Sequence, residues 1–512
     1  MKKVIGSVTS LAALVLLSYY GTGLMTEHTL KKNLSLLDQS NGLSAQITDY
    51  HRGLFTSKLN LSWKLLMPER FVSGASDQVT ILPSKTYTFE MPVTIYHGPV
   101  IYSDKGVKFG LGYANSEVIL PEAYQSEFSE SFTSDSVVPK LDLAFFVTYT
   151  NKMLLHVDVP AFRLISKQDN SQFQWLGMKS EHTFSSNMNE VEGDVVVDGA
   201  RISQADHTAS MSKLTSTYDI HRSSSGLFLG DVTVNVPAFE ITFKDQKILD
   251  VQSVQLTTSS DVDEGLFNSS FHAAFDKAFM HEKNYGPGRV SFAIKNLDAD
   301  TLVDMNKKMS DAQHGSDAAR QQAALAILPD LPKLFGKGAM VDVSEFNIVG
   351  PEGEIDGSMH IALPKSDAGN PFQLMQKIEG EGKVKLPEAL LSAMILRAEK
   401  EKLLAQTGGA QTRENSPSIP VSSTAEVKKD TQQQPAENVA KSASSQSDVA
   451  TSAVTAQSAD EQAQIATKNR IANLINAGAI VLKDTYYVID VKLAAGQISV
   501  NGRPLSAEML QF

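Results

Sequence analysis

The sequence predicts a mainly β protein with a few helices (α+β), built from antiparallel sheets behind one N-terminal transmembrane helix. Three observations predict this fold class. An uncharged stretch runs from Val4 to Leu24, polar and apolar residues alternate over much of 44–296, and helix-forming segments are concentrated late in the chain. Alternation is typical of a sheet with one buried face, because successive strand residues point to opposite sides.

The N-terminal stretch is long enough to cross a membrane as a helix. At about 1.5 Å per residue it would cover roughly 30 Å, the thickness of the hydrocarbon core. Lys2 and Lys3 precede it and favour a cytoplasmic N-terminus, so residues 1–25 are predicted to be a signal anchor. The alternative is a cleaved signal peptide and a soluble exported protein, because Gly21 and Gly23 imitate the small residues of a cleavage site.

The composition limits the chemistry of the protein. The chain of 512 residues contains no cysteine, which excludes structural disulfides, thiolate metal ligands and a lipid-modified N-terminal Cys. It carries 58 acidic and 46 basic residues, a formal net charge of −12. That balance argues against nucleic acid as a partner, because neutralising phosphates requires a basic surface.

Residues 26–298 are predicted to form a β-rich body. Leu59, Leu61, Trp63 and Leu65 alternate with polar residues, as on a strand that is buried on one side. Turn residues separate this strand from later ones with the same period, which lie at 195–197, 232–236, 239–243 and 290–294.

An internal echo suggests that this body contains a duplicated, curved β unit. The order Tyr-His-Arg-Gly-Leu-Phe at 50–55 is approximated again between Tyr218 and Phe228, and Gly98-Pro99 is matched by Gly286-Pro287. Two related units would then span about 44–180 and 215–298. The alternative is coincidence among common turn residues.

The rest of the ordered chain is predicted to be helices plus a hairpin (299–406), followed by a helix and a closing β-hairpin (460–512). Helix formers fill 300–328, with Gly315 as a weak point, and Pro387 starts a helix that runs to about Gln406. A hairpin is expected at 339–363. Near the C-terminus we expect a helix at 460–477 and strands at 486–493 and 497–500.

Residues 407–459 differ from the rest of the chain in composition. Gln, Ser, Thr, Ala, Glu, Lys and Pro dominate the segment, and it contains no aromatic residue. Such a segment cannot bury enough apolar surface to offset the entropy of ordering it. We therefore predict a disordered insertion within the fold.

Two short motifs are the candidate structural or interaction site: Tyr50-His51-Arg52-Gly53 and His97-Gly98-Pro99. In the structural interpretation, Arg52 pairs with a carboxylate or carbonyls, Gly53 takes a positive φ, and Leu54 and Phe55 enter a core. In the functional interpretation, the motif is a polar site close to the bilayer that grips a partner or a lipid headgroup.

These motifs, together with the charged start, the single apolar helix and the closing hairpin at 495–502, resemble the YdgA-like family of bacterial envelope proteins, a domain of unknown function (DUF945). The resemblance covers most of the chain in layout, and the insertion departs from it. It implies a single-pass anchor in the bacterial inner membrane with the bulk of the chain in the periplasm. It supplies no substrate and no catalytic residue.

The sequence gives no support for an enzyme. It contains no HExxH, GxGxxG, GxSxG or phosphate-binding loop motif, so no cofactor, no metal and no catalytic residue is predicted. Ser210 and Lys213 match SxxK, but the segment reads as strand, whereas that pair needs a helix. Gly336-Lys337-Gly338 is better explained as the end of a helix.

Two function classes remain, with an unrecognised enzyme as a third. The first is a scaffold that handles phospholipid or another hydrophobic ligand, with a long antiparallel sheet whose apolar face has few helices to cover it. The second is an adaptor that recruits other envelope proteins through its β body and its insertion.

Overall fold

The computed structural model describes residues 18–31, 43–120 and 122–510, apart from residue 29 and gaps at 68–69, 74–78, 83–84, 104–105, 314–316, 366–375 and 407–447. The chain divides into two compact units. The first contains the residues up to Gly382 together with Lys492–Gln497, and the second contains Lys383–Val491 and Ile498–Phe512.

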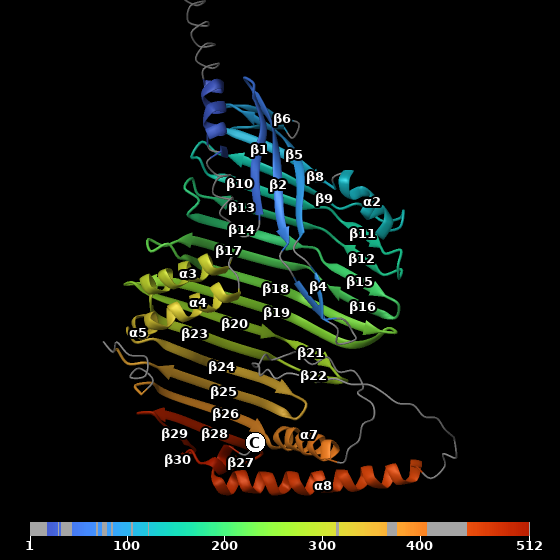
Figure 1. Ribbon diagram of the computed structural model, residues 1–512, viewed down its shortest axis with the longest axis vertical. Helices are drawn as coiled ribbons and strands as arrows, with labels where there is room; N and C mark the ends of the chain where they lie inside the picture. Colours follow the sequence, from blue (N-terminus) through green and yellow to red (C-terminus); the bar gives the residue numbers. More distant parts are fainter. Residues whose placement is uncertain are drawn as a thin grey trace, which may run out of the picture. The chain divides into compact units, whose positions relative to one another are not determined.

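The first unit is built on one long antiparallel sheet (Figure 1). Each strand pairs with the next in space, and the order follows the chain. The strands of this main row are β1 (Leu43–Arg52), β2 (Thr56–Met67), β5 (Lys85–His97), β8 (Gly112–Ile119), β9 (Lys140–Val147), β10 (Met153–Val159), β13 (Met178–Phe184), β14 (Glu190–Val197), β17 (Leu214–Arg222), β18 (Phe228–Phe243), β19 (Gln246–Asp263), β20 (Leu266–Phe275), β23 (Gly288–Asp298), β24 (Met340–Gly350) and β25 (Gly353–Ala362).

A second row of shorter strands extends the middle of this sheet. The long strands β18 and β19 belong to both rows, because β16 pairs with the second half of β18 and β21 pairs with the first half of β19. Gly177 and Gly199, with φ of 126° and 132°, separate strands of the two rows that follow each other directly in the chain. The second row contains β11 (Phe162–Ile165), β12 (Gln172–Trp175), β15 (Ala200–Gln204), β16 (His207–Met211), β21 (Lys277–Met280) and β22 (Lys283–Tyr285).

The remaining elements of the first unit are short. Two small hairpins pair β3 (Arg70–Ser73) with β4 (Val79–Leu82) and β6 (Ile101–Ser103) with β7 (Gly106–Lys108). An N-terminal helix spans 18–28. It is followed along the chain by α2 (Glu122–Ser131), α3 (Ala299–Gln313), α4 (Asp317–Ile327), the 3₁₀ turn η1 (Leu328–Asp330) and α5 (Leu331–Phe335).

Helices α3 and α5 pack against strands through two small buried clusters. Ala299 of α3 joins Leu227 and Leu229, and Leu334 of α5 joins Leu297 and Ala339. Only part of the long sheet is therefore covered by these helices.

The second unit consists of a helix pair and short strands. Its core is a cluster of buried residues that includes Leu391, Leu474, Ile480 and Tyr487. The elements that enter this unit are β26 (Glu379–Pro387), α7 (Glu388–Gln406), α8 (Asp448–Ala477), β27 (Val481–Lys483), β28 (Tyr486–Ala494), β29 (Gln497–Val500), β30 (Arg503–Pro504) and the 3₁₀ turn η2 (Ala507–Leu510).

The predicted fold class, mainly β with antiparallel sheets and a few helices, is confirmed. The predicted hairpin at 339–363 appears as β24 and β25, and the helix after Pro387 is α7. In place of one helix at 300–328 there are two, α3 and α4, with residues 314–316 between them outside the description.

Two helices differ from the expectation. Helix α2 lies within the region predicted to be β-rich, and α8 begins at Asp448 rather than at Asp460. The start of α8 falls within the predicted insertion, where alanine and glutamine favour helix once the later turns are packed. The rest of that insertion, 407–447, lies outside the described residues.

The predicted transmembrane segment lies mostly outside the description, which begins at residue 18. Of the helices that the structure describes, none combines the length and the apolar character needed to span a membrane.

Candidate functional site

The first strands of the long sheet turn away from the rest and face it. Strand β5 pairs with β8 over only Thr94–His97, and the preceding residues of β5 pair with β2 alone. In Figure 1, β1, β2 and β5 run steeply across the strands that follow. Two layers of one continuous sheet thus enclose a space between them.

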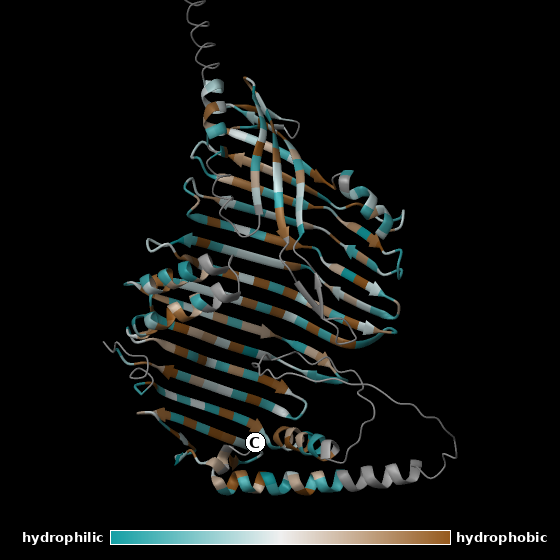
Figure 2. Cartoon of the chain, viewed as in Figure 1, coloured by the Kyte–Doolittle hydropathy of each residue, from teal (hydrophilic) through white to brown (hydrophobic). Residues whose placement is uncertain are grey.

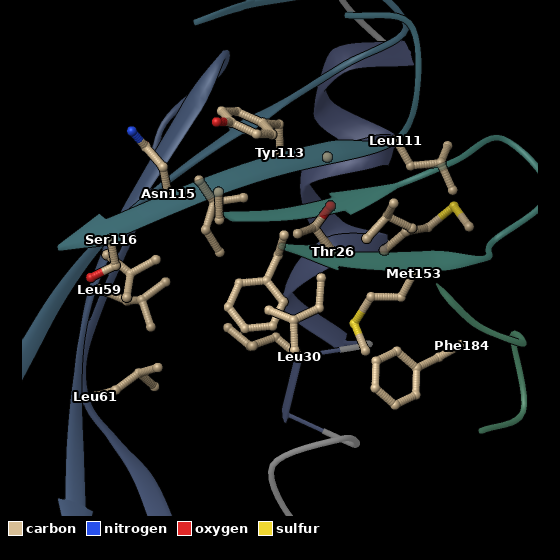
Figure 3. A pocket seen from close by; sticks show the side chains of 18 of the residues that line it. Thr26, Leu30, Leu59, Leu61, Leu111, Tyr113, Asn115, Ser116, Met153 and Phe184 are labelled. Atoms are coloured by element: carbon tan, nitrogen blue, oxygen red, sulfur yellow. The ribbon is translucent and has the colours of Figure 1, made fainter. Parts of the chain in front are cut away.

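That space is an apolar cavity of about 360 Å³ (Figure 3). Its walls come from both layers of the sheet, and their surface is almost wholly apolar, although Thr26, Asn115, Ser116 and Asn151 also line it. The main contributors are Leu59, Leu61 and Trp63 of β2, Met91, Val93 and Ile95 of β5, Ala114 of β8, Phe145 and Val147 of β9, Met153 and Leu155 of β10, and Phe184 of β13.

Strand alternation explains why the cavity is apolar. Leu59 and Leu61 of β2 pair with Val93 and Met91 of β5, so four apolar side chains share the inner face of this layer. All four are buried, and they belong to one hydrophobic cluster. In the facing layer, the cross-strand pair Phe145–Leu155 occupies the same side as Val147 and Met153.

The N-terminal helix closes one side of the cavity. Met25 and Thr26 of this helix contribute to the lining, as does Leu30 beyond it. The Thr26 hydroxyl donates a hydrogen bond to the carbonyl of Thr22, 2.8 Å away, so its polarity is satisfied within the helix. In the part of the chain that the structure describes, the indole N–H of Trp63 is buried and has no hydrogen-bond partner.

The predicted motif at 50–53 holds this helix. The Arg52 guanidinium donates to the Glu27 carboxylate at 3.1 Å and to the Tyr20 hydroxyl at 3.3 Å, and it lies over the Tyr20 ring. Lys31, 2.7 Å from Glu27, and Arg52 together lower the pKa of that carboxyl group. The predicted pairing of Arg52 with a carboxylate is confirmed.

Two details of the structural interpretation were wrong. Gly53 does not have a positive φ, and it is required for another reason. Its N–H donates to the Thr56 carbonyl at 2.8 Å, and a Cβ on Gly53 would lie only 2.6 Å from that oxygen. Leu54 and Phe55 are exposed rather than in a core, because the tight turn points them outward, and Phe55 meets Tyr19 edge to face.

The second motif, His97-Gly98-Pro99, contacts the same helix. His97 is 1% exposed, and its Nε2 lies 3.1 Å from the Ser57 hydroxyl. Burial lowers the pKa of the imidazole, so His97 is held neutral. Its ring packs so closely on Gly23 that a Cβ there would lie 2.8 Å from the ring.

Gly98 and Val100 complete this contact. Gly98 has a φ of +130°, and a Cβ on it would overlap the Tyr19 ring. The Tyr19 hydroxyl donates to the Val100 carbonyl at 2.6 Å, while the Pro99 carbonyl accepts a hydrogen bond from Tyr149. The two motifs, distant in sequence, therefore lie under one helix.

The other two motif residues have different surroundings. Tyr50 packs against the cavity-side cluster, and burial raises the pKa of its hydroxyl. His51 is largely exposed and lies 3.1 Å from the Asp49 carboxylate. Neither Tyr50 nor His51 forms an ion pair with the helix. The attachment of the helix to the body therefore depends on Arg52, Gly98 and His97.

The whole chain was compared with known proteins. A family model described as a bacterial protein of unknown function (DUF945) matches residues 1–508. The chain belongs to this family. No curated protein and no solved structure is a significant match.

The family membership agrees with the predicted resemblance and assigns no activity to the cavity. Among the described residues, no group of three or more His, Cys, Asp or Glu side chains is placed to hold a metal ion. The two SxxK residues do not lie on a helix, since Ser210 lies in β16 and Lys213 precedes β17.

Sequence reasoning found the residues that hold the helix but missed the cavity. The signal was present in the alternation of Met91, Val93 and Ile95, and again in Leu143, Phe145 and Val147. The alternation does not show that the sheet folds back at β5, and only this fold-back brings the two apolar faces together.

Proposed function

We propose that this protein is anchored in the bacterial inner membrane, faces the periplasm, and binds the hydrocarbon part of a lipid or similar hydrophobe in its cavity. The observation that carries the proposal is the cavity itself. Its volume of about 360 Å³ lies within the range of ordinary ligand pockets, and its walls are almost wholly apolar.

The chemistry of the walls favours a hydrocarbon ligand. An apolar cavity of this kind gives water too few hydrogen-bond partners to be held well. A ligand that fills it gains roughly 25 cal/mol for each Å² of apolar surface removed from water. Trp63 lines the cavity, and its indole N–H, unpaired among the described residues, suits an ester or carboxyl oxygen.

The position of the cavity along the chain supports a membrane source for the ligand. The uncharged stretch Val4–Leu24 overlaps the start of the helix at 18–28, which supplies Met25 and Thr26 to the wall. A lipid leaving the outer surface of the bilayer beside this anchor would have a short path into the cavity.

Lipid content of the full-length protein tests the proposal. The chain is purified in a mild detergent, washed, and extracted for mass spectrometry of bound lipids. We expect phospholipid or another acyl-chain lipid in a fixed ratio to protein.

Two adjacent leucines provide a matched pair of variants. Leu155 lines the cavity, and Leu154 points to the opposite face of β10. Leu155→Asn is expected to lose most of the bound lipid and Leu154→Asn to retain it. Lipid-free wild-type protein, or equal retention by both variants, would contradict the proposal and favour the adaptor alternative.

A further inference from the structure

The cavity is one end of a much longer apolar face. The cross-strand register carries the cavity side of the sheet from Phe184 in β13 to Val191 in β14 and Ile220 in β17. Four residues further along β14, on the same face, Val195 opposes Ser180 and Ser216. The residues that follow the cavity lining along the sheet therefore stay on the same side of the sheet as the cavity.

The same register extends across the next strands. Val234 of β18 opposes Leu256 of β19, which opposes Ala273 of β20, which opposes Val290 of β23. Beside this line, Phe271 opposes Phe292. Figure 2 shows the resulting alternation of brown and teal along these strands.

The opposite face of the same strands is polar. In β14 the alternate positions are Glu190, Glu192 and Asp194, and in β18 they are Asp231, Thr233 and Asn235. The apolar character thus belongs to one face and is not a property of the strands as a whole.

Polar residues on the apolar face bond to one another. Both ring nitrogens of His182 are occupied, one by the Tyr218 hydroxyl and the other by the Ser180 hydroxyl at 2.9 Å. Burial lowers the pKa of His182, which keeps the ring neutral. This group therefore adds no charge to the face.

The middle of the face is partly accessible in the part of the chain that the structure describes. Val234, Leu256, Phe271 and Phe292 are only half-buried, and none of them belongs to the four hydrophobic clusters. Helices α3 and α5 pack further along, near Phe267 and Ile294. A continuous row of partly accessible apolar side chains on one face of a sheet is a candidate binding surface.

The extent of the face matches a long ligand better than a compact one. Strands in a sheet lie about 4.8 Å apart, so the succession β9, β10, β13, β14, β17, β18, β19, β20 and β23 covers roughly 40 Å. The hydrocarbon core of a whole bilayer is about 30 Å thick. Extended acyl chains therefore fit along the face.

We propose that this face is a second, elongated binding surface for the acyl chains of membrane phospholipid, continuous with the cavity. The inference rests on the proposed function and adds to it: the cavity is the entry point, and the chains lie along the sheet from β13 toward β23. The continuity of one apolar face, fixed by register, decides for acyl chains over a compact hydrophobe.

Site-specific photo-crosslinking tests this inference in the full-length protein. The photoreactive residue p-benzoylphenylalanine replaces Val234 on the face, Asn235 on the opposite side of the same strand, or Leu155 in the cavity. Each protein is placed in vesicles of phosphatidylethanolamine and phosphatidylglycerol with labelled acyl chains. We expect label after illumination at Leu155 and Val234, and several-fold less at Asn235.

The outcomes separate the two proposals. Label at Leu155 without label at Val234 would overturn the extended surface and leave the cavity as the binding site. Label at none of the three positions would overturn both. Equal label at Val234 and Asn235, or a crosslink from Val234 to this chain's own 407–447 segment or to a second copy, would show that the face does not select lipid.

Discussion

At the scale of single residues, Gly23 and His97 set how the N-terminal helix lies on the body. Gly23 contacts the His97 ring, whereas Gly21 on the same helix has open space around its Cα. His97 in turn is buried against Ser57. The close packing of the helix on the body depends on the absence of a methyl group at Gly23 and on a neutral imidazole ring at His97.

The two glycines give a matched pair of alanine variants. Gly21→Ala is expected to stabilise the helix by up to about 1 kcal/mol, because alanine is the better helix former. Gly23→Ala places a methyl group against His97, and such overpacking costs about 1–3 kcal/mol. Hydrogen exchange of residues 18–28 measures both. Faster exchange is expected in Gly23→Ala only, and equal exchange in the two variants would refute the close contact.

The buried histidine predicts a pH dependence. Since burial holds the pKa of His97 below its ordinary value of 6.5, the unfolded chain binds a proton more readily than the folded one. The stability from a neutral His97 is present above about pH 6.5 and is lost as the pH falls through the folded-state pKa.

Urea unfolding at pH values from 8 to 5 measures this effect. The free energy of unfolding should fall more steeply with acidification in the wild type than in His97→Gln. His182, whose pKa burial also lowers, titrates in both proteins, so the difference in slope reports His97. Parallel slopes would show that His97 is not held neutral.

At the scale of elements, the sequence predicted the strands better than the helices. The alternation of Leu59, Leu61 and Trp63 identified β2 because side-chain period is a local property. Helix α2 was missed because Glu122–Ser131 has a weak apolar pattern, and the start of α8 was missed because composition alone suggested disorder. Neither boundary is set by a local signal.

The pairing of α7 with α8 yields a prediction for the second unit. Arg470 of α8 bonds to Glu399 of α7 at 2.6 Å, and both side chains are largely buried. Arg397 bonds to Glu401 within α7 at 3.1 Å, and both are exposed. Arg470→Ala removes one of the two cations that pair with the Glu399 carboxylate, the other being Lys402 at 3.2 Å, and should cost about 1.5–3 kcal/mol.

The exposed pair is the control, because surface ion pairs contribute at most about 1 kcal/mol. Amide exchange across α7 and α8 measures both variants. We expect a marked loss of protection in Arg470→Ala and little change in Arg397→Ala. If the two variants lose protection equally, the interhelical bond does not stabilise this unit.

At the scale of the whole molecule, the cavity exists because one sheet turns back on itself where β5 leaves β8. The sequence predicted an antiparallel sheet with an apolar side and few covering helices, and in the structural interpretation of the motif it predicted that Arg52 would pair with a carboxylate or with carbonyls. It could not predict the cavity, because Val93 and Phe145 belong to faces that meet only after β5 leaves β8. The fold-back depends on contacts between residues that are far apart in the sequence, and no local turn motif marks it.

The central claim, that the cavity binds acyl chains, is open to a spectroscopic test. The chain has two tryptophans, and Trp63 lines the cavity. In Trp175→Phe, fluorescence reports Trp63 alone, and phospholipids with brominated acyl chains quench a tryptophan only at close range. Ala114 lines the cavity, and Ala144 lies on the opposite face of the neighbouring strand.

The deciding measurement is therefore the quenching of Trp63 by brominated lipid in Trp175→Phe, with Ala114→Phe or Ala144→Phe added. We predict strong quenching that is lost when Ala114→Phe fills the cavity and kept in Ala144→Phe. Absence of quenching in Trp175→Phe, or the same quenching in both filled variants, would contradict the account.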